Sequence, residues 1–598
     1  MLFFFKIFRN ILPAEFQYYG IWYALCFILQ SLFAWRIGKL LNLNFLCKIV
    51  LTCLLTCTPI IIYRISAEYQ SLLAHFLILW AISIYIENNA NKSFEWFLCN
   101  TTAILIHPYL CLMTLVITFS DFINTIFINK ITEKYLLLKI GIYSISFVFI
   151  LYQIGILGTS VNNYSEGGFG LYHLNLVNFI NPLFVHSPFL PSYLNENDFE
   201  GYCYLGFGTI ILYLFEIAYI LRNKINIINN YYIPLFIALC LFLLFSFGST
   251  VSFFKYNLYL FNGDSIDFFS MFRANGRFIW SVYYSIIIFS IYLYNKISIT
   301  WSYKKYFFIV VLMAINLYEI SEYMSIIRPK LYKNTYIDSL RYTSEVWQEL
   351  RRQYNTIRLL NRKGIYPNNW QQISYIASKF NFATNVASLA RMDTNAVLER
   401  DDADFEILKN ENFSADTIYI FDDKHIPIIN KMKNKDIVIA CLDGLHILLP
   451  NGVKFTRYSC VPNEKIFNKN DKFFISKNNS IPLFSGWSDL ENDGVWSDSY
   501  HSRIVFDSSR PLEKIVLELH PYTDKDCIEQ KADIYVNNIL SKRVKISNDT
   551  KIYIDVKNNM NTYYEIELVY FNAKTPKKIF QSADSRLLSI KLRSIEFY

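Results

Sequence analysis

The sequence predicts an α-helical polytopic membrane bundle of about ten spans, followed by an α/β unit and a C-terminal β-sandwich. Hydrophobic residues make up 53% of the 598 residues and charged residues only 18%, below the roughly 25% of soluble domains. Residues 1–330 contain 20 Lys and Arg and 15 Asp and Glu, so 35 of 330, about 11%, are charged. Residues 331–598 contain the other 37 and 34, so 71 of 268, about 26%, are charged. The first part therefore has membrane composition, and the second has that of ordinary soluble protein.

Composition also excludes several classes of protein. The 51 Phe and 45 Tyr exclude a disordered chain. The net charge of +8 divides into +5 and +3 between the two parts, too diffuse to indicate a nucleic-acid partner. The 11 cysteines show no metal-type spacing, and we expect neither a zinc site nor a disulfide framework.

The apolar part contains ten stretches that approach the roughly 20 mostly apolar residues of a membrane helix. The second and fourth are the weakest, because Lys48 interrupts one and His107 ends the other early. The stretches are residues 18–38, 45–63, 68–86, 94–108, 109–128, 135–157, 204–221, 232–249, 278–295 and 305–323.

Loop charges predict the orientation of the bundle. Lys and Arg gather in alternate loops, whereas the long loop at 158–203 has neither. Because positively charged loops stay in the cytoplasm, that loop, the loop at 250–277 and the whole tail are expected outside. Met1 is then also outside, on a short amphipathic opening. We expect an upstream helix and loop to be missing from this chain, which would give eleven spans.

The tail is predicted to form two parts, so the expected domains are 1–330, 331–465 and 466–598. In the α/β unit, helical stretches alternate with short strands at 356–360, 417–421 and 436–440. In the last part there are only strands with polar turns between them, as in a β-sandwich. These strands are 503–506, 514–519, 533–536, 551–555, 563–571 and 588–597.

A polar stripe is the strongest candidate site in the apolar part. Arg64, Glu68, Ser71 and His75 are spaced by four, three and four residues, which places them on one face of a helix. Ionisable groups in a bilayer are costly, so their presence needs an explanation. We interpret the stripe as lining a polar cavity, with Arg64 and His75 as substrate-binding residues. The alternative is an Arg64–Glu68 ion pair that fixes helix packing.

Further polar residues lie at predicted outer turns. His107 precedes a proline and is either substrate-binding or structural. Glu200 opens the motif EGYCYLG at 200–206, where a carboxylate with a raised pKa could act as a base. Tyr202, in the same motif, suits a sugar face. The alternative is a re-entrant loop whose Glu200 caps the next helix.

The third outer loop contains FRANGRF at 272–278. Arg273 and Arg277 are four residues apart at the mouth of a span and could together hold a phosphate, since guanidinium groups bind such oxygens bidentately. The alternative is anchoring to lipid headgroups. Asp264 and Asp267 could bind a divalent cation, and no other cofactor is indicated.

Two tryptophans in the predicted sandwich are candidates for contact with sugar. Trp487 and Trp496 lie among turn residues, and exposed indoles stack on sugar rings. The alternative is that both belong to the core of the sandwich.

These motifs resemble a family of bacterial polytopic membrane proteins that is similar to GT-C-type glycosyltransferases. The resemblance rests on PAEFQYYGIW at 13–22, the 64–75 stripe, HPY at 107–109, GGFGLY at 167–172, EGYCYLG, FRANGRF and the tail's GVWS at 494–497.

The resemblance implies a polyprenyl-phosphate-linked sugar donor and an active site at the outer face of the bacterial inner (cytoplasmic) membrane. GT-C enzymes carry their key Asp in the first outer loop, and the matching region would lie before Met1. The expected catalytic residue is then Glu68 or Glu200, with Glu166 and Asp264 as further candidates. Unless one of them substitutes, we expect the polypeptide as written to be inactive.

We therefore predict a membrane glycosyltransferase that transfers a sugar to a cell-envelope glycan or lipid. Arg273 and Arg277 would hold the departing phosphate, with Arg64 as a third cation. One alternative is a non-catalytic envelope scaffold that binds glycan or lipid. Another is a transporter or flippase, which the absence of a sequence repeat disfavours.

Overall fold

The computed structural model divides the chain into two compact units that meet in sequence at residues 334 and 335. The structure describes residues 5, 7–8, 10–13, 16–66, 69–87, 92–128, 136–153, 169, 172–185, 187–193, 198–223, 230–260, 272–297, 304–333, 346–360, 369–387, 394–422, 425–429, 432, 436–451, 467–468, 470–476, 483–485, 487–488, 490–498, 500–523, 528–537, 539–556, 563–574, 586 and 588–598.

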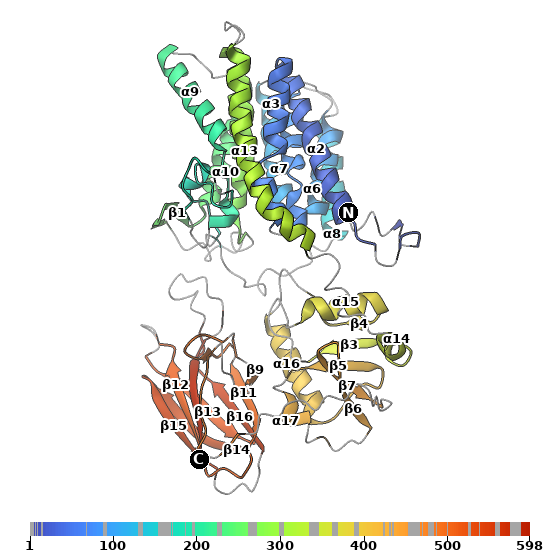
Figure 1. The fold of residues 1–598 in the computed structure, drawn as a ribbon, viewed down its shortest axis with the longest axis vertical. Helices are drawn as coiled ribbons and strands as arrows, with labels where there is room; N and C mark the ends of the chain where they lie inside the picture. Colours follow the sequence, from blue (N-terminus) through green and yellow to red (C-terminus); the bar gives the residue numbers. More distant parts are fainter. Residues whose placement is uncertain are drawn as a thin grey trace. The chain divides into compact units, whose positions relative to one another are not determined.

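The first unit is a helical bundle (Figure 1). Its helices are α2 (Tyr19–Leu40), α3 (Phe45–Thr56), α4 (Pro59–Ser66), α5 (Phe76–Ile86), α6 (Ser93–Ile106), α7 (Pro108–Ile123), α8 (Leu136–Gln153), α9 (Phe207–Asn223), α10 (Ile233–Phe247), α12 (Ile279–Ile297) and α13 (Lys304–Lys333).

Among the described residues, six segments of this bundle are long and apolar enough to cross a membrane, so the protein is a multi-pass membrane protein. Each of the ten predicted stretches contains a helix, but several of these helices are too short to qualify alone. The count of ten spans stays a prediction. The qualifying segments are Tyr19–Leu40, Phe45–Ile65, Pro108–Ile126, Asn230–Phe247, Asn275–Ile297 and Tyr306–Ser325.

The prediction of a single helix over 68–86 was wrong. A 3₁₀ turn, η1 (Gln70–Leu73), precedes α5, which begins only at Phe76. The backbone N–H of His75 donates to the carbonyl of Leu73 at 2.8 Å, so the i→i−4 ladder of an α-helix is broken there. Arg64 and His75 therefore do not share one helical face.

Helices α9 and α13 cross at very short distance. A Cβ added to Gly208, in the first turn of α9, would lie 2.1 Å from the carbonyl oxygen of Leu312. Asn316 of α13 accepts a hydrogen bond from the backbone N–H of Gly208 at 2.8 Å. The missing side chain is thus what allows the start of α9 to rest on α13.

A β-hairpin lies within the predicted outer loop at 250–277 and was missed by the sequence reasoning. It consists of β1 (Thr250–Phe253) and β2 (Tyr256–Tyr259), paired antiparallel. Asn175, which precedes the 3₁₀ turn η5 (Leu176–Phe179), forms a bridge with Ser252 of β1.

The second unit begins with an α/β part, as predicted. Its five-stranded sheet has the order β4-β3-β5-β7-β6. Strand β3 is parallel to β4 and β5, whereas β7 is antiparallel to both its neighbours. The elements are α14 (Val346–Arg351), β3 (Thr356–Leu359), α15 (Trp370–Phe380), β4 (Ala383–Thr384), α16 (Thr394–Lys409), β5 (Thr417–Phe421), α17 (Ile426–Ile429), β6 (Ile437–Leu442) and β7 (Leu445–Pro450).

Two antiparallel sheets complete the second unit and share one hydrophobic core. One has the order β10-β17-β12-β15 with β8 beside β17, and the other has the order β14-β13-β16-β11-β9 (Figure 1). The strands are β8 (Lys472–Phe474), β9 (Leu483–Ser485), β10 (Val495–Trp496), β11 (His501–Asp507), β12 (Lys514–Pro521), β13 (Gln530–Val536), β14 (Ile539–Ile546), β15 (Thr550–Asp555), β16 (Tyr563–Tyr570) and β17 (Ile590–Phe597).

The close crossing of α9 and α13 predicts that residue 208 must lack a side chain. Replacing Gly208→Ala should separate the two helices and lower the unfolding temperature of the purified protein in detergent, because the new Cβ meets backbone. Gly141→Ala is the matched control, since Gly141 is exposed on α8 and nothing lies within 4 Å of its added Cβ. That variant should be neutral or more stable by up to about 1 kcal/mol. Equal effects of both substitutions would contradict the packing.

Candidate functional site

A buried carboxylate between two arginines forms the centre of the site. Glu200 lies on the 3₁₀ turn η6 (Asp198–Gly201), Arg64 in the last turn of α4, and Arg277 on the 3₁₀ turn η9 (Asn275–Phe278). Arg64 Nη2 donates to Glu200 Oε2 at 2.7 Å, and Arg277 Nε donates to the same oxygen at 2.8 Å. Arg277 Nη2 also donates to Oε1. The geometry joins three segments that the sequence reasoning had treated separately.

The electrostatics of Glu200 differ from the prediction of a raised pKa. Burial alone would raise the pKa of this carboxyl, but the charges and hydrogen bonds of Arg64 and Arg277 lower it to about 2. Glu200 is therefore ionised at neutral pH, and its negative charge forms ion pairs with Arg64 and Arg277. This environment is the opposite of what a general base needs.

Arg64 is the most unusual side chain of the cluster. It is 1% exposed, and its Nε and Nη1 have no acceptor among the described residues. Its guanidinium carbon lies 4.9 Å from the centre of the Trp280 ring on α12. A buried donor without an acceptor costs about 1–3 kcal/mol, so these two donors require an oxygen partner beyond the described side chains.

The indole ring of Trp280 also stacks on His75, and its own N–H is another buried donor without an acceptor among the described residues. The rings of His75 and Trp280 stack with their centres 4.4 Å apart, and His75 Nδ1 hydrogen-bonds the hydroxyl of Tyr284 at 2.8 Å. His75 Nε2 and Trp280 Nε1 are buried without a partner in the described part of the chain. Arg64 and His75 thus meet through Trp280, which the sequence reasoning did not select.

Close backbone packing holds the centre together. A Cβ added to Gly276 would lie 2.9 Å from both the Cα and the N of Gly201, and 2.9 Å from the carbonyl of Tyr172. Gly201 follows Glu200 and Gly276 precedes Arg277, so two glycines allow the carboxylate and the guanidinium to meet. The N–H of Gly276 donates to the Tyr172 carbonyl at 2.9 Å.

His107 has a structural role at the edge of the site. It caps α7, since its Nδ1 accepts from the backbone N–H of Tyr109 at 3.2 Å, and Pro108 occupies the first helical position, as is favourable. Tyr109 in turn places its ring 5.0 Å from the guanidinium carbon of Arg277 and accepts from the N–H of Ala274 at 3.0 Å. His107 therefore positions the residue that supports Arg277.

Two other predicted residues have different contacts. Arg273 is exposed, with its guanidinium carbon 5.5 Å from the Tyr172 ring, and Tyr202 is buried with its hydroxyl bonded to the Pro182 carbonyl at 3.0 Å. Their binding roles stay predictions. Four of the predicted acidic residues lie outside the described residues: Glu68, Glu166, Asp264 and Asp267.

No group of three or more His, Cys, Asp or Glu side chains within the described ranges could hold a metal ion. The predicted divalent-cation site at Asp264 and Asp267 is therefore neither supported nor contradicted.

The two tryptophans of the sandwich have different environments. Trp487 is 2% exposed, belongs to the core, and donates from Nε1 to the carbonyl of Arg503 at 3.0 Å, so the prediction of a sugar contact is wrong for it. Trp496 is half-buried and lies edge-on to His520 and Tyr522, with ring centres 5.6 and 6.0 Å away. Its contact with sugar stays a prediction.

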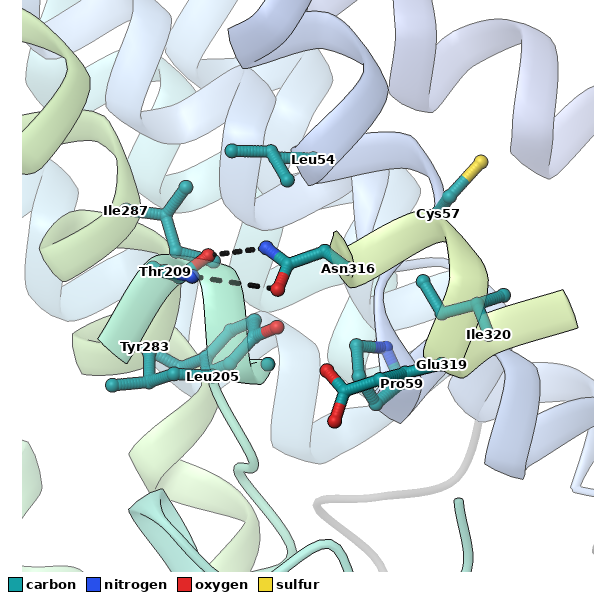
Figure 2. Close-up of a pocket in the computed structure, with 11 residues that line it drawn as sticks. Leu54, Cys57, Pro59, Leu205, Thr209, Tyr283, Ile287, Asn316, Glu319 and Ile320 are labelled. Carbon is teal, nitrogen blue, oxygen red and sulfur yellow. Dashed lines mark hydrogen bonds between the residues drawn. The ribbon is translucent and has the colours of Figure 1, made fainter. Parts of the chain in front are cut away.

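A small pocket, which none of Arg64, Glu200 and Arg277 lines, lies between α3, α9, α12 and α13 (Figure 2). Asn316 Nδ2 donates to Thr209 Oγ1 at 2.6 Å. Glu319, also on α13, accepts from the Tyr204 hydroxyl at 2.7 Å and the Phe207 N–H at 2.8 Å, which fixes the start of α9. The sequence reasoning passed over Glu319, although an acidic residue inside a predicted span was the signal that could have found it.

These features define a class of protein: a multi-pass helical membrane domain with a buried charged cluster, joined to α/β and β-sandwich parts. A family model described as "Domain of unknown function (DUF6311)" matches residues 1–321, and the DUF6311 C-terminal domain model matches residues 346–450. The chain belongs to the DUF6311 family. No match was found among the curated proteins.

Solved structures with similar parts are distant in sequence. The arabinofuranosyltransferase AftD from Mycobacteria is 8% identical over 97% of this chain and 55% of its own, with a TM-score of 0.43. The carbohydrate-binding module CBM36 in complex with calcium and xylotriose is 12% identical over 21% of this chain and 99% of its own, with a TM-score of 0.15. CBM51-2 from Clostridium perfringens ZmpB is 16% identical over 21% of this chain and 24% of its own, with a TM-score of 0.12.

The Glu200 cluster predicts a defined pH response. Because the pKa of Glu200 is lowered from 4.5 to about 2, the cluster's contribution to the free energy of unfolding is complete above pH 4.5. It is lost as the pH falls toward 2. Glu200→Gln removes the only described counter-charge of the buried Arg64 and the largely buried Arg277 and should cost about 3–5 kcal/mol. In this variant the unfolding temperature, measured in detergent, should also fall less steeply as the pH is lowered from 4.5 toward 2.

The matched control is Glu87→Gln at another ion pair of the bundle. Glu87 is one-third exposed and shares Arg36 with Glu95, so its loss should cost only about 0–1 kcal/mol. If Glu200→Gln unfolds no more easily than Glu87→Gln, the cluster is not the constraint described.

Proposed function

We propose that the protein is a membrane glycosyltransferase that moves a sugar from a polyprenyl-phosphate-linked donor to a cell-envelope glycan or lipid. The observation that carries the proposal is the buried cluster of Arg64, Glu200 and Arg277. Its described side chains have two positive charges and one negative charge, and Arg64 has donors without an acceptor. A bound phosphate would balance this charge, and one of its oxygens would accept from Nε or Nη1 of Arg64.

The reaction assigns distinct roles to these residues. The acceptor hydroxyl attacks the anomeric carbon, the bond from that carbon to the phosphate oxygen breaks, and the phosphate departs with the electron pair. Arg64 and Arg277 stabilise the charge that develops on it. The hydroxyl proton needs a base. Glu200 does not suit this role because both of its oxygens are held by arginines, so Glu68 remains the proposed base.

A second candidate is a non-catalytic envelope scaffold that binds lipid phosphate or glycan. The low pKa of Glu200 favours it, because the one acidic residue described at the site is committed to an ion pair. Binding of phosphate needs only the arginines, whereas transfer also needs a base.

We further propose that the cluster lies at the extracytoplasmic end of the bundle, in a bacterial inner membrane. Loops predicted to be cytoplasmic meet at Arg36, which pairs with Glu87 and Glu95, and at Asn44, which donates to Asn295 at 2.6 Å. The turns that contain His107, Glu200 and Arg277 belong to the other set of loops, which the loop charges predict to lie on the extracytoplasmic side.

Sugar transfer tests the proposed enzyme. The purified protein in detergent should incorporate labelled sugar from a polyprenyl-phosphate donor into envelope extract. Arg64→Lys and Arg277→Lys keep the charge but lose the planar fork, and each should reduce incorporation about 10²–10³-fold. Arg36→Lys, near the other ends of the helices, is the control and should retain activity.

The outcomes separate the candidates. Incorporation that is unchanged in both arginine variants would remove the donor-site assignment. If the unmodified protein binds the polyprenyl phosphate but transfers no sugar, and the two variants lose that binding, the scaffold is favoured.

A reporter fused after Tyr598 tests the proposed orientation. An enzyme that is active only outside the cytoplasm should be active in this fusion, because the loop charges place the tail outside. The same reporter fused after Leu40 should be silent, since the Lys39 loop is expected inside. A reversed pattern would overturn the orientation and with it the proposed outer site.

A further inference from the structure

The β1–β2 hairpin exposes an unusual density of large apolar side chains. Between residues 253 and 260, only Lys255 and Asn257 are polar, and all eight residues are exposed. The exposed fractions run from 39% for Phe254 to 69% for Tyr256. We call this the hairpin surface, and it comprises Phe253, Phe254, Tyr256, Leu258, Tyr259 and Leu260.

The hairpin surface follows an exposed apolar surface on α10, which is part of a candidate membrane span. Helix α10 belongs to the candidate span Asn230–Phe247, and β1 begins three residues after that span ends. Along α10 an exposed apolar stripe leads toward the hairpin at helical spacing. The stripe consists of Phe236, Ile237, Leu241 and Leu244.

The backbone fixes the depth that such a hairpin can occupy. Strand β2 pairs only with β1 among the strands that the structure describes, so its outer edge keeps backbone groups that need water. Hydrocarbon cannot satisfy them, whereas the headgroup region can. Tyrosines are favoured at that level, and a lysine can reach lipid phosphates from it. Tyr256, Tyr259 and Lys255 supply both.

Hydrogen bonds from Asn175 link the hairpin to a segment that packs beside the charged cluster. Phe254 adopts a φ of 52°, which is strained for a residue with a side chain. Asn175 holds it from both sides: its Oδ1 accepts from the Phe254 N–H at 3.1 Å, and its Nδ2 donates to the Phe254 carbonyl at 2.8 Å. Two residues before Asn175, the carbonyl of His173 lies against Gly201, which follows Glu200.

We propose that the hairpin surface inserts into the boundary between headgroups and acyl chains of the leaflet at the Glu200 end of the bundle. The lipid bilayer is its partner. Through Asn175 and Gly201, this insertion sets the depth at which Arg64 and Arg277 meet lipid phosphates. The insertion itself does not depend on sugar transfer and stands even where the proposed enzyme activity fails.

Depth-dependent quenching tests the insertion. An environment-sensitive fluorescent amino acid replaces Tyr256 in the full chain, reconstituted into phosphatidylcholine vesicles. Tyr500, an exposed tyrosine of the second unit, is the matched control site. The probe at 256 should be quenched more by lipids with a nitroxide near the headgroup than by lipids with it at the chain end. Aqueous iodide should quench it several-fold less than the probe at 500.

Two results would overturn the proposal. Equal quenching by iodide at both sites would show that the hairpin lies in water. Protection from both iodide and nitroxide lipids would show that a protein surface covers it. A cooperative unfolding transition like that of the unmodified chain shows that the labelled protein is folded, and Leu260 offers a second labelling site on the same surface.

Discussion

The ion pair of Glu200 with Arg64 and Arg277 is the constraint on which the membrane domain's polar end depends. It joins α4, η6 and η9, segments separated by 136 and 77 residues. Removing charges from water is expensive, and only close geometry with several hydrogen bonds offsets that cost. Here both oxygens of one carboxylate are used, so the three segments must meet within hydrogen-bond distance. A shift in any one of them leaves a buried charge without its partner.

The surrounding backbone is built to allow that meeting. Gly201 and Gly276 approach each other to distances that a side chain would forbid, and each is adjacent in sequence to a member of the ion pair. Trp280 provides the opposite wall, with Arg64 and His75 packed on its ring. The cluster is therefore a packed assembly of glycine backbone, aromatic rings and charge.

Sequence reasoning predicted the elements better than their partnerships. Low charge and apolar runs located the helices, and alternating strands located most of the sandwich, because these signals are local. Strand β14 was missed because six of its eight residues are exposed, including the first five in a row, which leaves little alternation. The stripe from Arg64 to His75 failed because a period of four assumes a continuous helix, and η1 interrupts it. The ring that both residues contact, Trp280, lies more than 200 positions away in the sequence.

The charge balance of the cluster has a chemical consequence. Glu200 binds Arg64 through Nη2 alone and leaves Nε and Nη1 each without an acceptor among the described residues. An entering oxyanion can therefore accept from Nε or from Nη1 while Glu200 stays in place, so binding does not require the ion pair to break. With Glu200 ionised, the described side chains carry one surplus positive charge, which favours a ligand with a single negative charge. A phosphodiester, which carries one charge, suits this balance better than a diphosphate, since each further buried negative charge would lack a counter-ion.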